Sequence, residues 1–335
     1  MTVVPLLTMT THGLYCPVGD FHIDPHRGVP RAIVTHAHGD HLYKGSKHYL
    51  VSTASEGVSR VRLSPNANVD SIEYGETVER NGVRISLHPA GHILGSAQVR
   101  LEYRGEVWVV SGDYKTCGGD PTCTPFEPLR CHGFVTESTF ALPIYHWASA
   151  ASVFESINRW WRGNADDGCV CVLFAYSLGK AQRLLAGLDP GIGPIVVHET
   201  MAPLVQAYRD ASVWLPPTVR ESESRRAIVL APSSVQATPW LDAFEPHSTA
   251  YASGWLAVRK ARRAVDRNFV LSDHADWRGL LWAIDATRAQ TVYVTHGSTQ
   301  ILVKYLRGRG LDASMLTRTP GELAGSHSQQ LLAAG

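Results

Sequence analysis

The chain has 335 residues, 44% of them hydrophobic and 18% charged, so it can bury a substantial core and global disorder is excluded. Lysine and arginine number 31 against 30 aspartates and glutamates, and the net charge of +1 excludes a polycation but not a local basic groove. No run of about 18 apolar residues occurs, so we expect no membrane span, and the N-terminus has no secretory pattern. The six cysteines form no C-x-x-C pair, which favours reduced thiols and a cytoplasmic protein.

The first third of the sequence predicts short strands that end in histidine or acidic residues. Residues 31–36 read RAIVTH, an apolar strand ending in histidine, and residues 83–92 form a strand that runs into a Gly-His turn. Residues 98–103 and 107–113 flank Arg-Gly-Glu, which is a hairpin signal, and the second of these strands ends in Gly-Asp. The strand at 134–139 ends in an acidic and hydroxyl cluster.

The middle of the chain has a different pattern. A helix is predicted at 149–162, and the strands at 169–175, 194–198 and 227–232 alternate with helical stretches, which favours a separate parallel sheet. From about residue 268 the early pattern of strand, histidine and glycine returns. The sequence therefore predicts an α/β protein whose first domain is interrupted by an insertion, with boundaries at 1–142, 143–267 and 268–335.

The sharpest signal is the segment His36-Ala37-His38-Gly39-Asp40-His41, which directly follows a predicted strand. Ten isolated histidines carry no ligand spacing, and we interpret them as hydrogen-bonded surface or core residues: His12, His22, His26, His48, His88, His132, His146, His198, His247 and His327. Alternate side chains of a loop can point to opposite sides. His36 and His38 can therefore bind one metal ion while Asp40 and His41 turn to a second.

Two neighbouring ions need a shared ligand and further ligands from other strand ends. His92, Asp113 and His296 each follow a predicted strand. Asp113 is the natural bridge, because a carboxylate offers two oxygens. By position we assign His36, His38, His92 and Asp113 to the first ion, and Asp40, His41, Asp113 and His296 to the second.

This pattern, with His92 in AGHILGSAQ and Asp113 in SGDY, resembles the metallo-β-lactamase superfamily. The resemblance implies an αββα sandwich with the metal ligands on loops at one edge of two packed sheets. Asp24, in HIDP, is similar to the family's early aspartate, which orients the metal loop without binding the metal.

Three later motifs resemble those of the β-CASP nucleases, the group of Artemis, ribonuclease J and the pre-mRNA cleavage endonuclease. They are TESTF at 136–140, SDHAD at 272–276 and VTHG at 294–297. In that group an inserted α/β β-CASP domain lies between the first two motifs. The nearest resemblance is to bacterial ligase-associated DNA exonucleases and RNA 3′-processing exonucleases, and a DNA ligase or helicase partner is implied by that resemblance alone.

Phosphodiester hydrolysis needs an activated water, compensation of charge on the phosphate oxygens, and a proton for the leaving oxygen. Two divalent cations can serve the first two needs, and ligands without thiolate suit zinc, manganese or iron. We predict Asp40 as a catalytic residue as well as a ligand. His274 is the candidate proton donor, and a nearby carboxylate would raise its pKa. The family resemblance implies that Glu137 is this partner, unless the pair is purely structural. Asp276 is expected to support His274 or the metal loop.

A substrate-binding segment is predicted in the insertion, where residues 176–183 follow a strand and open a helix whose backbone N–H groups can bind phosphate. The turn at 253–255 offers a tryptophan for base stacking, and the basic residues of 256–267 suit nucleic-acid phosphates. The alternatives are a buried tryptophan and solvated basic helix faces. The predicted substrate-binding residues are Ser138, Tyr176, Ser177, Lys180, Arg183, Ser253 and Trp255.

These features together predict a dinuclear metal-dependent nuclease that acts on DNA, in DNA repair. An RNA-processing nuclease of the same fold is the alternative, because His296 is more typical of the RNA-cutting branch, and Artemis relatives carry an apolar residue there. A small-molecule hydrolase shares H-x-H-x-D-H but would not need the insertion or the later motifs. A scaffold without metal is disfavoured, because the ligand set is complete. No motif decides between exonuclease and endonuclease.

Overall fold

The structure is a computed structural model that describes residues 5–258, 263–317 and 321–322. The chain divides into two compact units. The first unit comprises residues 1–118, 123–146 and 274–335, and the second unit comprises 119–122 and 147–273. Sheets and helices occur in both units, so the predicted α/β class is confirmed. Within the described ranges, no helix combines the length and hydropathy that crossing a membrane requires.

The first sheet of the first unit has seven strands in the order β19-β1-β2-β3-β4-β5-β6. Pairing is antiparallel from β19 to β3 and parallel from β3 to β6. The parallel half matters for the site, because its strands end at the same edge. The strands are β1 (Thr8–Thr10), β2 (Gly13–Cys16), β3 (Phe21–Ile23), β4 (Arg31–Ile33), β5 (His48–Ser52), β6 (Val69–Ile72) and β19 (Gly321–Glu322).

The second sheet of this unit also has seven strands, in the order β18-β17-β11-β10-β9-β8-β7. The strands from β7 to β10 are antiparallel neighbours, and β10, β11, β17 and β18 are parallel. The strands are β7 (Thr77–Arg80), β8 (Val83–Pro89), β9 (Ala97–Tyr103), β10 (Glu106–Val110), β11 (Gly133–Glu137), β17 (Thr291–Thr295) and β18 (Asp312–Met315).

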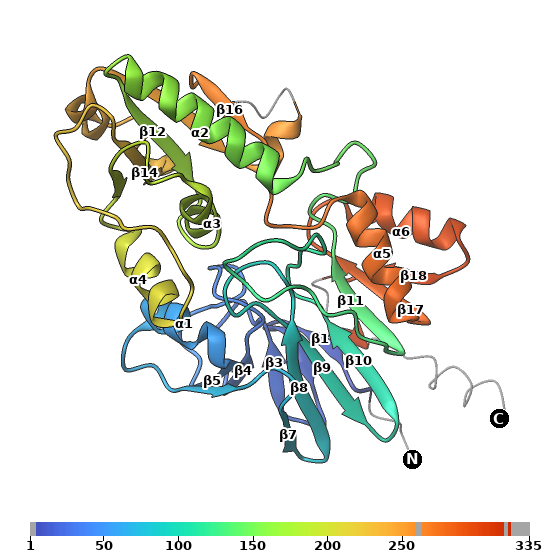
Figure 1. The fold of residues 1–335 in the computed structure, drawn as a ribbon. Coiled ribbons are helices and arrows are strands. Elements are labelled where there is room, and N and C mark those ends of the chain that lie inside the picture. Colours follow the sequence, from blue (N-terminus) through green and yellow to red (C-terminus); the bar gives the residue numbers. More distant parts are fainter. Residues whose placement is uncertain (1–4, 259–262, 318–320, 323–335) are drawn as a thin grey trace, which may run out of the picture. The chain divides into compact units, whose positions relative to one another are not determined.

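The two sheets pack face to face. One buried cluster combines Leu14 and Ile33 of the first sheet with Leu87 and Trp108 of the second. A second cluster joins the outer face of the second sheet to α5 (Trp277–Thr287) and α6 (Thr299–Gly308) (Figure 1). After η1 (Thr53–Ser55), α1 (Glu56–Leu63) contacts β5 and β6 of the first sheet. The layers therefore run helix, sheet, sheet, helix.

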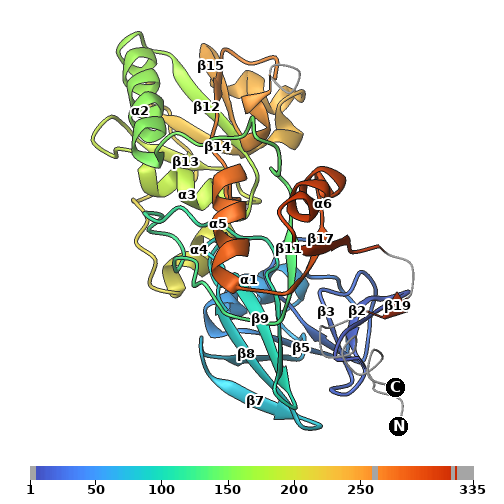
Figure 2. The ribbon, with the colours of Figure 1, turned by 90° about the vertical axis from the view of Figure 1, so that its right-hand side faces the viewer.

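The second unit has a sheet of its own, with five parallel strands in the order β13-β14-β12-β15-β16. It is the separate parallel sheet that the alternating pattern predicts. Helix α2 packs along β12, as Figure 2 shows. The elements are α2 (Ala150–Asp166), β12 (Val170–Ala175), α3 (Lys180–Gly187), β13 (Ile195–Val197), α4 (Ala202–Asp210), β14 (Ile228–Pro232), η2 (Ser233–Val235), η3 (Pro239–Phe244), β15 (His247–Ala252), η4 (Gly254–Ala257) and β16 (Arg267–Phe269).

Candidate metal centre

The candidate ligands of the first unit follow strands whose carboxyl ends meet at one edge. In the second sheet β10, β11 and β17 are parallel neighbours, with Val110 opposite Val135 and Glu137 opposite Thr295. This register brings the residues after each strand together, including Asp113 and His296. The first sheet contributes His36 and the loop that follows it, directly after β4.

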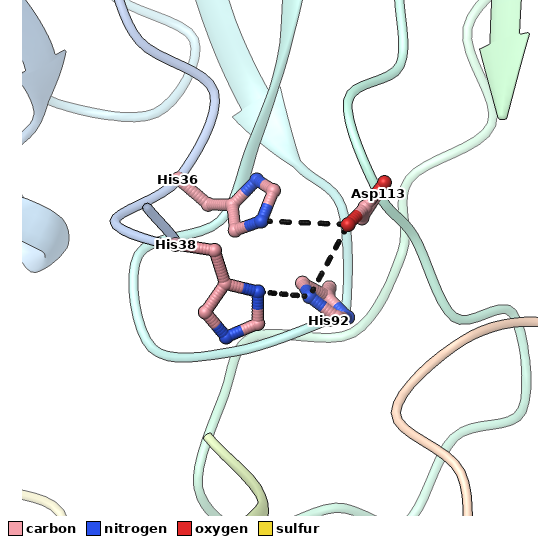
Figure 3. Close-up of side chains that lie close together, drawn as sticks. All are labelled: His36, His38, His92 and Asp113. Atoms are coloured by element: carbon pink, nitrogen blue, oxygen red, sulfur yellow. Dashed lines mark hydrogen bonds and ion pairs between the residues drawn. The ribbon is translucent and has the colours of Figure 1, made fainter. Parts of the chain in front are cut away.

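A first donor group consists of His36, His38, His92 and Asp113, whose ligand atoms all lie within 4.8 Å of one another. Figure 3 shows His36 and His92 turned toward the carboxylate of Asp113, and His38 turned toward His92. Asp113 Oδ2 lies 3.5 Å from His36 Nε2 and 3.8 Å from His92 Nε2, and His38 Nδ1 lies 3.2 Å from His92 Nε2. All four residues are buried, so few waters can compete for their ligand atoms.

A second donor group shares Asp113 with the first and adds His41 and His296. His41 Nε2 lies 3.5 Å from Asp113 Oδ2, and His296 Nδ1 lies 3.8 Å from Asp113 Oδ1. Asp40 is not brought into this group. Its side chain is 72% exposed, and its Oδ2 lies 3.8 Å from His41 Nε2 at the margin of the site. The predicted ligand and catalytic roles of Asp40 therefore stay predictions.

The donor atoms themselves indicate that a cation fits both groups. Buried polar atoms in native proteins are almost always hydrogen-bonded. Nevertheless His36 Nε2, His41 Nε2 and Asp113 Oδ1 are buried without a hydrogen-bond partner. A cation would satisfy these atoms, and imidazole with carboxylate suits zinc or manganese. These clusters of histidine and aspartate can bind metal ions.

The charges around Asp113 set different protonation states for the neighbouring imidazoles. Burial lowers the pKa of His36 well below its ordinary value, and the nearby His41 and His38 lower it further. Burial alone would also lower the pKa of His41, but Asp113 and Asp24 outweigh burial and raise this pKa to about 10. His36 is therefore ready to donate a lone pair, whereas a cation must displace a proton from His41.

Asp24 holds His41 in place from the side away from Asp113. It accepts hydrogen bonds from Thr35 N at 2.8 Å and Thr35 Oγ1 at 2.6 Å, and its Oδ2 lies 2.7 Å from His41 Nδ1. Nδ1 is thereby engaged, and Nε2 is left for the donor group. This placement supports the predicted orienting role of Asp24. Thr35 was not anticipated, although a hydroxyl residue directly before the first ligand was a usable signal.

Glu137 and His274 form a pair beside the two donor groups. His274 Nδ1 lies 3.0 Å from both carboxylate oxygens of Glu137, which is 1% exposed, and Tyr114 N donates to Glu137 Oε1 at 2.7 Å. With Asp113 the pair makes a third cluster of close ligand atoms. The imidazole of His274 faces that of His92, with ring centroids 4.5 Å apart. The carboxylate thus fixes Nδ1 of His274, an arrangement that fits the predicted Glu137–His274 pair.

Asp276 and Ser138 are used within the protein framework. Asp276 is the N-cap of α5 and accepts from Gly279 N at 2.9 Å. The Ser138 hydroxyl is buried and donates to the backbone carbonyls of Thr295 and His296. Ser138 thus ties the loop after β11 to the loop after β17. This engagement does not favour the predicted contact of Ser138 with substrate.

The segment 176–183 of the second unit is largely internal. Tyr176 is 51% exposed, but Lys180 and Arg183 are buried and lie 2.6 Å and 3.3 Å from the carboxylate of Asp273. The Ser177 carbonyl accepts a hydrogen bond from Gln182 Nε2 at 3.1 Å. Because both buried cations already pair with Asp273, this arrangement does not favour the predicted phosphate contact. Asp273 is a partner of these two cations that the sequence did not reveal.

The turn at 253–255 is more exposed. Ser253 Oγ accepts from Trp255 N at 3.3 Å and caps η4, and Trp255 is 49% exposed rather than buried. Its indole is therefore accessible, as the stacking prediction requires. Of the basic cluster, Arg259, Lys260 and Arg262 lie outside the described residues, and Arg263 stacks over the Tyr251 ring at 5.2 Å.

Comparisons with known proteins give three kinds of relative. The chain is 33% identical over 314 residues to a protein of Opitutus terrae named probable DNA ligase, a match that covers 90% of this chain and 30% of that protein. It is 26% identical over 190 residues to endoribonuclease YSH1 of Yarrowia lipolytica, covering 51% of this chain and 23% of the relative. It is 26% identical over 133 residues to cleavage and polyadenylation specificity factor subunit 3 of Dictyostelium discoideum, a match that covers 36% of this chain and 16% of that protein.

The chain thus spans less than a third of the length of these curated relatives. A solved structure of a protein of unknown function from Enterococcus faecalis shares the fold, with a TM-score of 0.58, 11% identity, and coverage of 88% of this chain and 81% of that one. No family model matches the sequence. The named relatives suggest the β-CASP nuclease family.

Proposed function

We propose that this chain is a dinuclear metal-dependent nuclease of the β-CASP group, with DNA as its substrate. The observation that carries the proposal is the pair of donor groups that share the buried Asp113, beside the Glu137–His274 pair. The helix, sheet, sheet, helix layers of the first unit support a metallo-β-lactamase sandwich. The second unit, with its own parallel sheet, supports an inserted β-CASP domain near the predicted boundaries.

Zinc or manganese ions held by the two donor groups would supply Lewis acidity for activating water and for neutralising phosphate charge. The chain's own residues arrange the rest. Asp24 holds His41 by Nδ1, so that Nε2 points to the second donor group. Glu137 holds His274 by Nδ1, which leaves Nε2 of His274 as the atom to carry a proton to the leaving oxygen.

DNA is favoured over RNA by one comparison, because a protein named probable DNA ligase contains a segment similar to 90% of this chain. That match also supports a DNA ligase as the partner, acting in DNA repair. The endoribonuclease relatives favour RNA instead, but their matches cover at most about half of the chain. All six cysteines lie within the described residues and none is in a disulfide, which supports the expected cytoplasmic, reducing environment.

The test uses metal-reconstituted protein and end-labelled single- and double-stranded DNA and RNA of matched sequence. We expect DNA to be degraded, and Asp113→Ala to abolish cleavage because it removes a ligand from both donor groups. Asp20→Ala is the matched control, because Asp20 is a half-exposed aspartate paired with Arg31 and should retain activity.

If RNA is cut preferentially, the proposed substrate changes from DNA to RNA, and metal-dependent phosphodiester hydrolysis remains the proposed reaction. Inert polynucleotides together with activity on thioesters or lactones would overturn the nuclease proposal. Product lengths resolved on a sequencing gel separate stepwise removal of terminal nucleotides from internal cuts.

A further inference from the structure

Lys180 and Arg183 belong to a buried ion network inside the second unit. Besides their bonds to Asp273, Arg183 Nε lies 3.0 Å from Asp120 Oδ2. The side chains of these four residues are between 4% and 9% exposed. Two cations and two carboxylates leave no net charge. Because removing a charge from water is costly, such a network is retained only where every member is well paired.

The same two cations also bind the backbone. Lys180 Nζ donates to the carbonyl of Leu271 at 3.1 Å, and Arg183 Nη1 donates to the carbonyl of Ser272. Positions 180 and 183 are three residues apart on α3 and therefore share one helix face. That face holds three consecutive residues, 271–273, by two carbonyls and one carboxylate.

His274 is the next residue in the chain, and the residues after it are held as well. Ala275 N donates to the carbonyl of Tyr114 at 2.7 Å, and Asp276 caps α5. Consecutive Cα atoms are about 3.8 Å apart, so a residue between two fixed neighbours has little freedom. In the sequence, His274 thus lies between residues 271–273, which are held within the second unit, and residues 275–276, which are held within the first.

We propose that Lys180 and Arg183 are positioning residues for His274, and that they act through Asp273 and the carbonyls before it rather than on substrate phosphate. The inference rests on the proposed function, in which His274 delivers the proton. A reacting group displaced by about 1 Å can lose about 100-fold in rate. Loosening residues 271–273 should therefore reduce turnover without weakening substrate or metal binding.

The first experiment compares Lys180→Met, which removes the charge but keeps the aliphatic length, with Arg159→Met on the exposed face of α2 as the control. On the nucleic acid that the wild type cuts fastest, we expect kcat to fall about 10- to 100-fold, with KM and bound metal unchanged. Lys180→Arg, which keeps the charge, should recover part of the loss. Should Lys180→Met not fold, Asp273→Asn tests the same link, because it keeps the side-chain shape.

The second experiment combines Lys180→Met with His274→Ala. Residues that act as a unit are not additive, so we expect Lys180→Met to cost nothing further once His274 is absent. A full multiplicative loss in the double variant would overturn the proposal. So would a raised KM with unchanged kcat, which is the result for a phosphate contact.

A third readout needs no activity. Hydrogen exchange of the peptide containing residues 271–276 should be faster in Lys180→Met than in the Arg159→Met control. Unchanged exchange there would contradict the positioning role. If the wild type cuts no nucleic acid, the proposed function fails, and this exchange result still decides whether Lys180 orders the segment.

Discussion

At the residue scale, the site depends on how neutral and charged imidazoles are kept apart around one carboxylate. Asp113 attracts protons to His41, while burial keeps His36 neutral. Asp24, which contacts Nδ1 of His41, raises the pKa of His41 further and so increases its difference from His36. The two donor groups therefore differ in how strongly a cation must compete with protons.

Asp24→Asn should reduce metal binding at the second donor group. The amide no longer fixes Nδ1 of His41 as an anion does, and this loss of orientation outweighs the easier release of the His41 proton that removal of the Asp24 charge brings. Metal analysis after dialysis should give about half the wild-type metal content, since Asp24 does not contact the first donor group. Asp20→Asn, on the neighbouring loop, should retain as much metal as the wild type. Equal metal loss in both variants would contradict the orienting role.

Metal-free protein should show a pH dependence caused by His41. The folded pKa of about 10 exceeds the ordinary 6.5, so this residue stabilises the fold fully below 6.5, and the contribution is lost as pH rises toward 10. Denaturant unfolding of chelated protein should therefore show stability falling across this window. In Asp24→Asn the slope should be shallower; an unchanged slope would argue against His41 as its source.

At the element scale, strand ends and helix caps place the functional side chains. Parallel neighbours β10, β11 and β17 place Asp113, Glu137 and His296 at one edge, and α5 begins at Trp277, three residues after His274. The predicted strands made this convergence foreseeable, because residues that follow parallel neighbours meet at the same edge. The cap role of Asp276 was not foreseen, although Asp followed by a helical pattern is an N-cap signal.

Asp276→Ala should lower the free energy of unfolding by about 1 kcal/mol, the usual cost of losing an N-cap. Asp276→Ser should recover most of it, because serine also caps helices. Bound metal should remain unchanged in both variants. Chemical denaturation and metal analysis measure the two effects, and loss of metal in Asp276→Ala would assign the residue to the metal loop instead.

At the scale of the whole molecule, the sequence predicted functional residues that lie close together in the chain better than contacts between residues that are far apart in it. The H-x-H-x-D-H segment places its ligands within a few residues, so spacing alone indicated a metal site. Lys180 and Asp273 are separated by 93 positions, and no local pattern shows that their charges meet in a buried network. The position of Asp40 at the margin is likewise set by the loop's final path, which residue spacing does not determine.

Removing the metal should affect the two units differently. Every residue of the three ligand clusters belongs to the first unit. Bound ligand at 100 times its dissociation constant stabilises a folded state by about 2.7 kcal/mol. Chelation should therefore increase hydrogen exchange around His36, His92 and Asp113 and leave peptides from β12 and β14 unchanged. An equal increase of hydrogen exchange in the peptides around the metal ligands and in those from β12 and β14 would indicate that the two units unfold as one cooperative unit.

Asp113 is common to all three clusters of close ligand atoms. One carboxylate thus serves as a junction through which both metal positions and the Glu137–His274 pair are linked. A substitution of Asp113 therefore affects both metal positions and the Glu137–His274 pair at the same time, and it cannot separate their contributions. Stepwise loss of function must instead begin at peripheral positions such as His38 or His296, where one cluster can fail while the others survive.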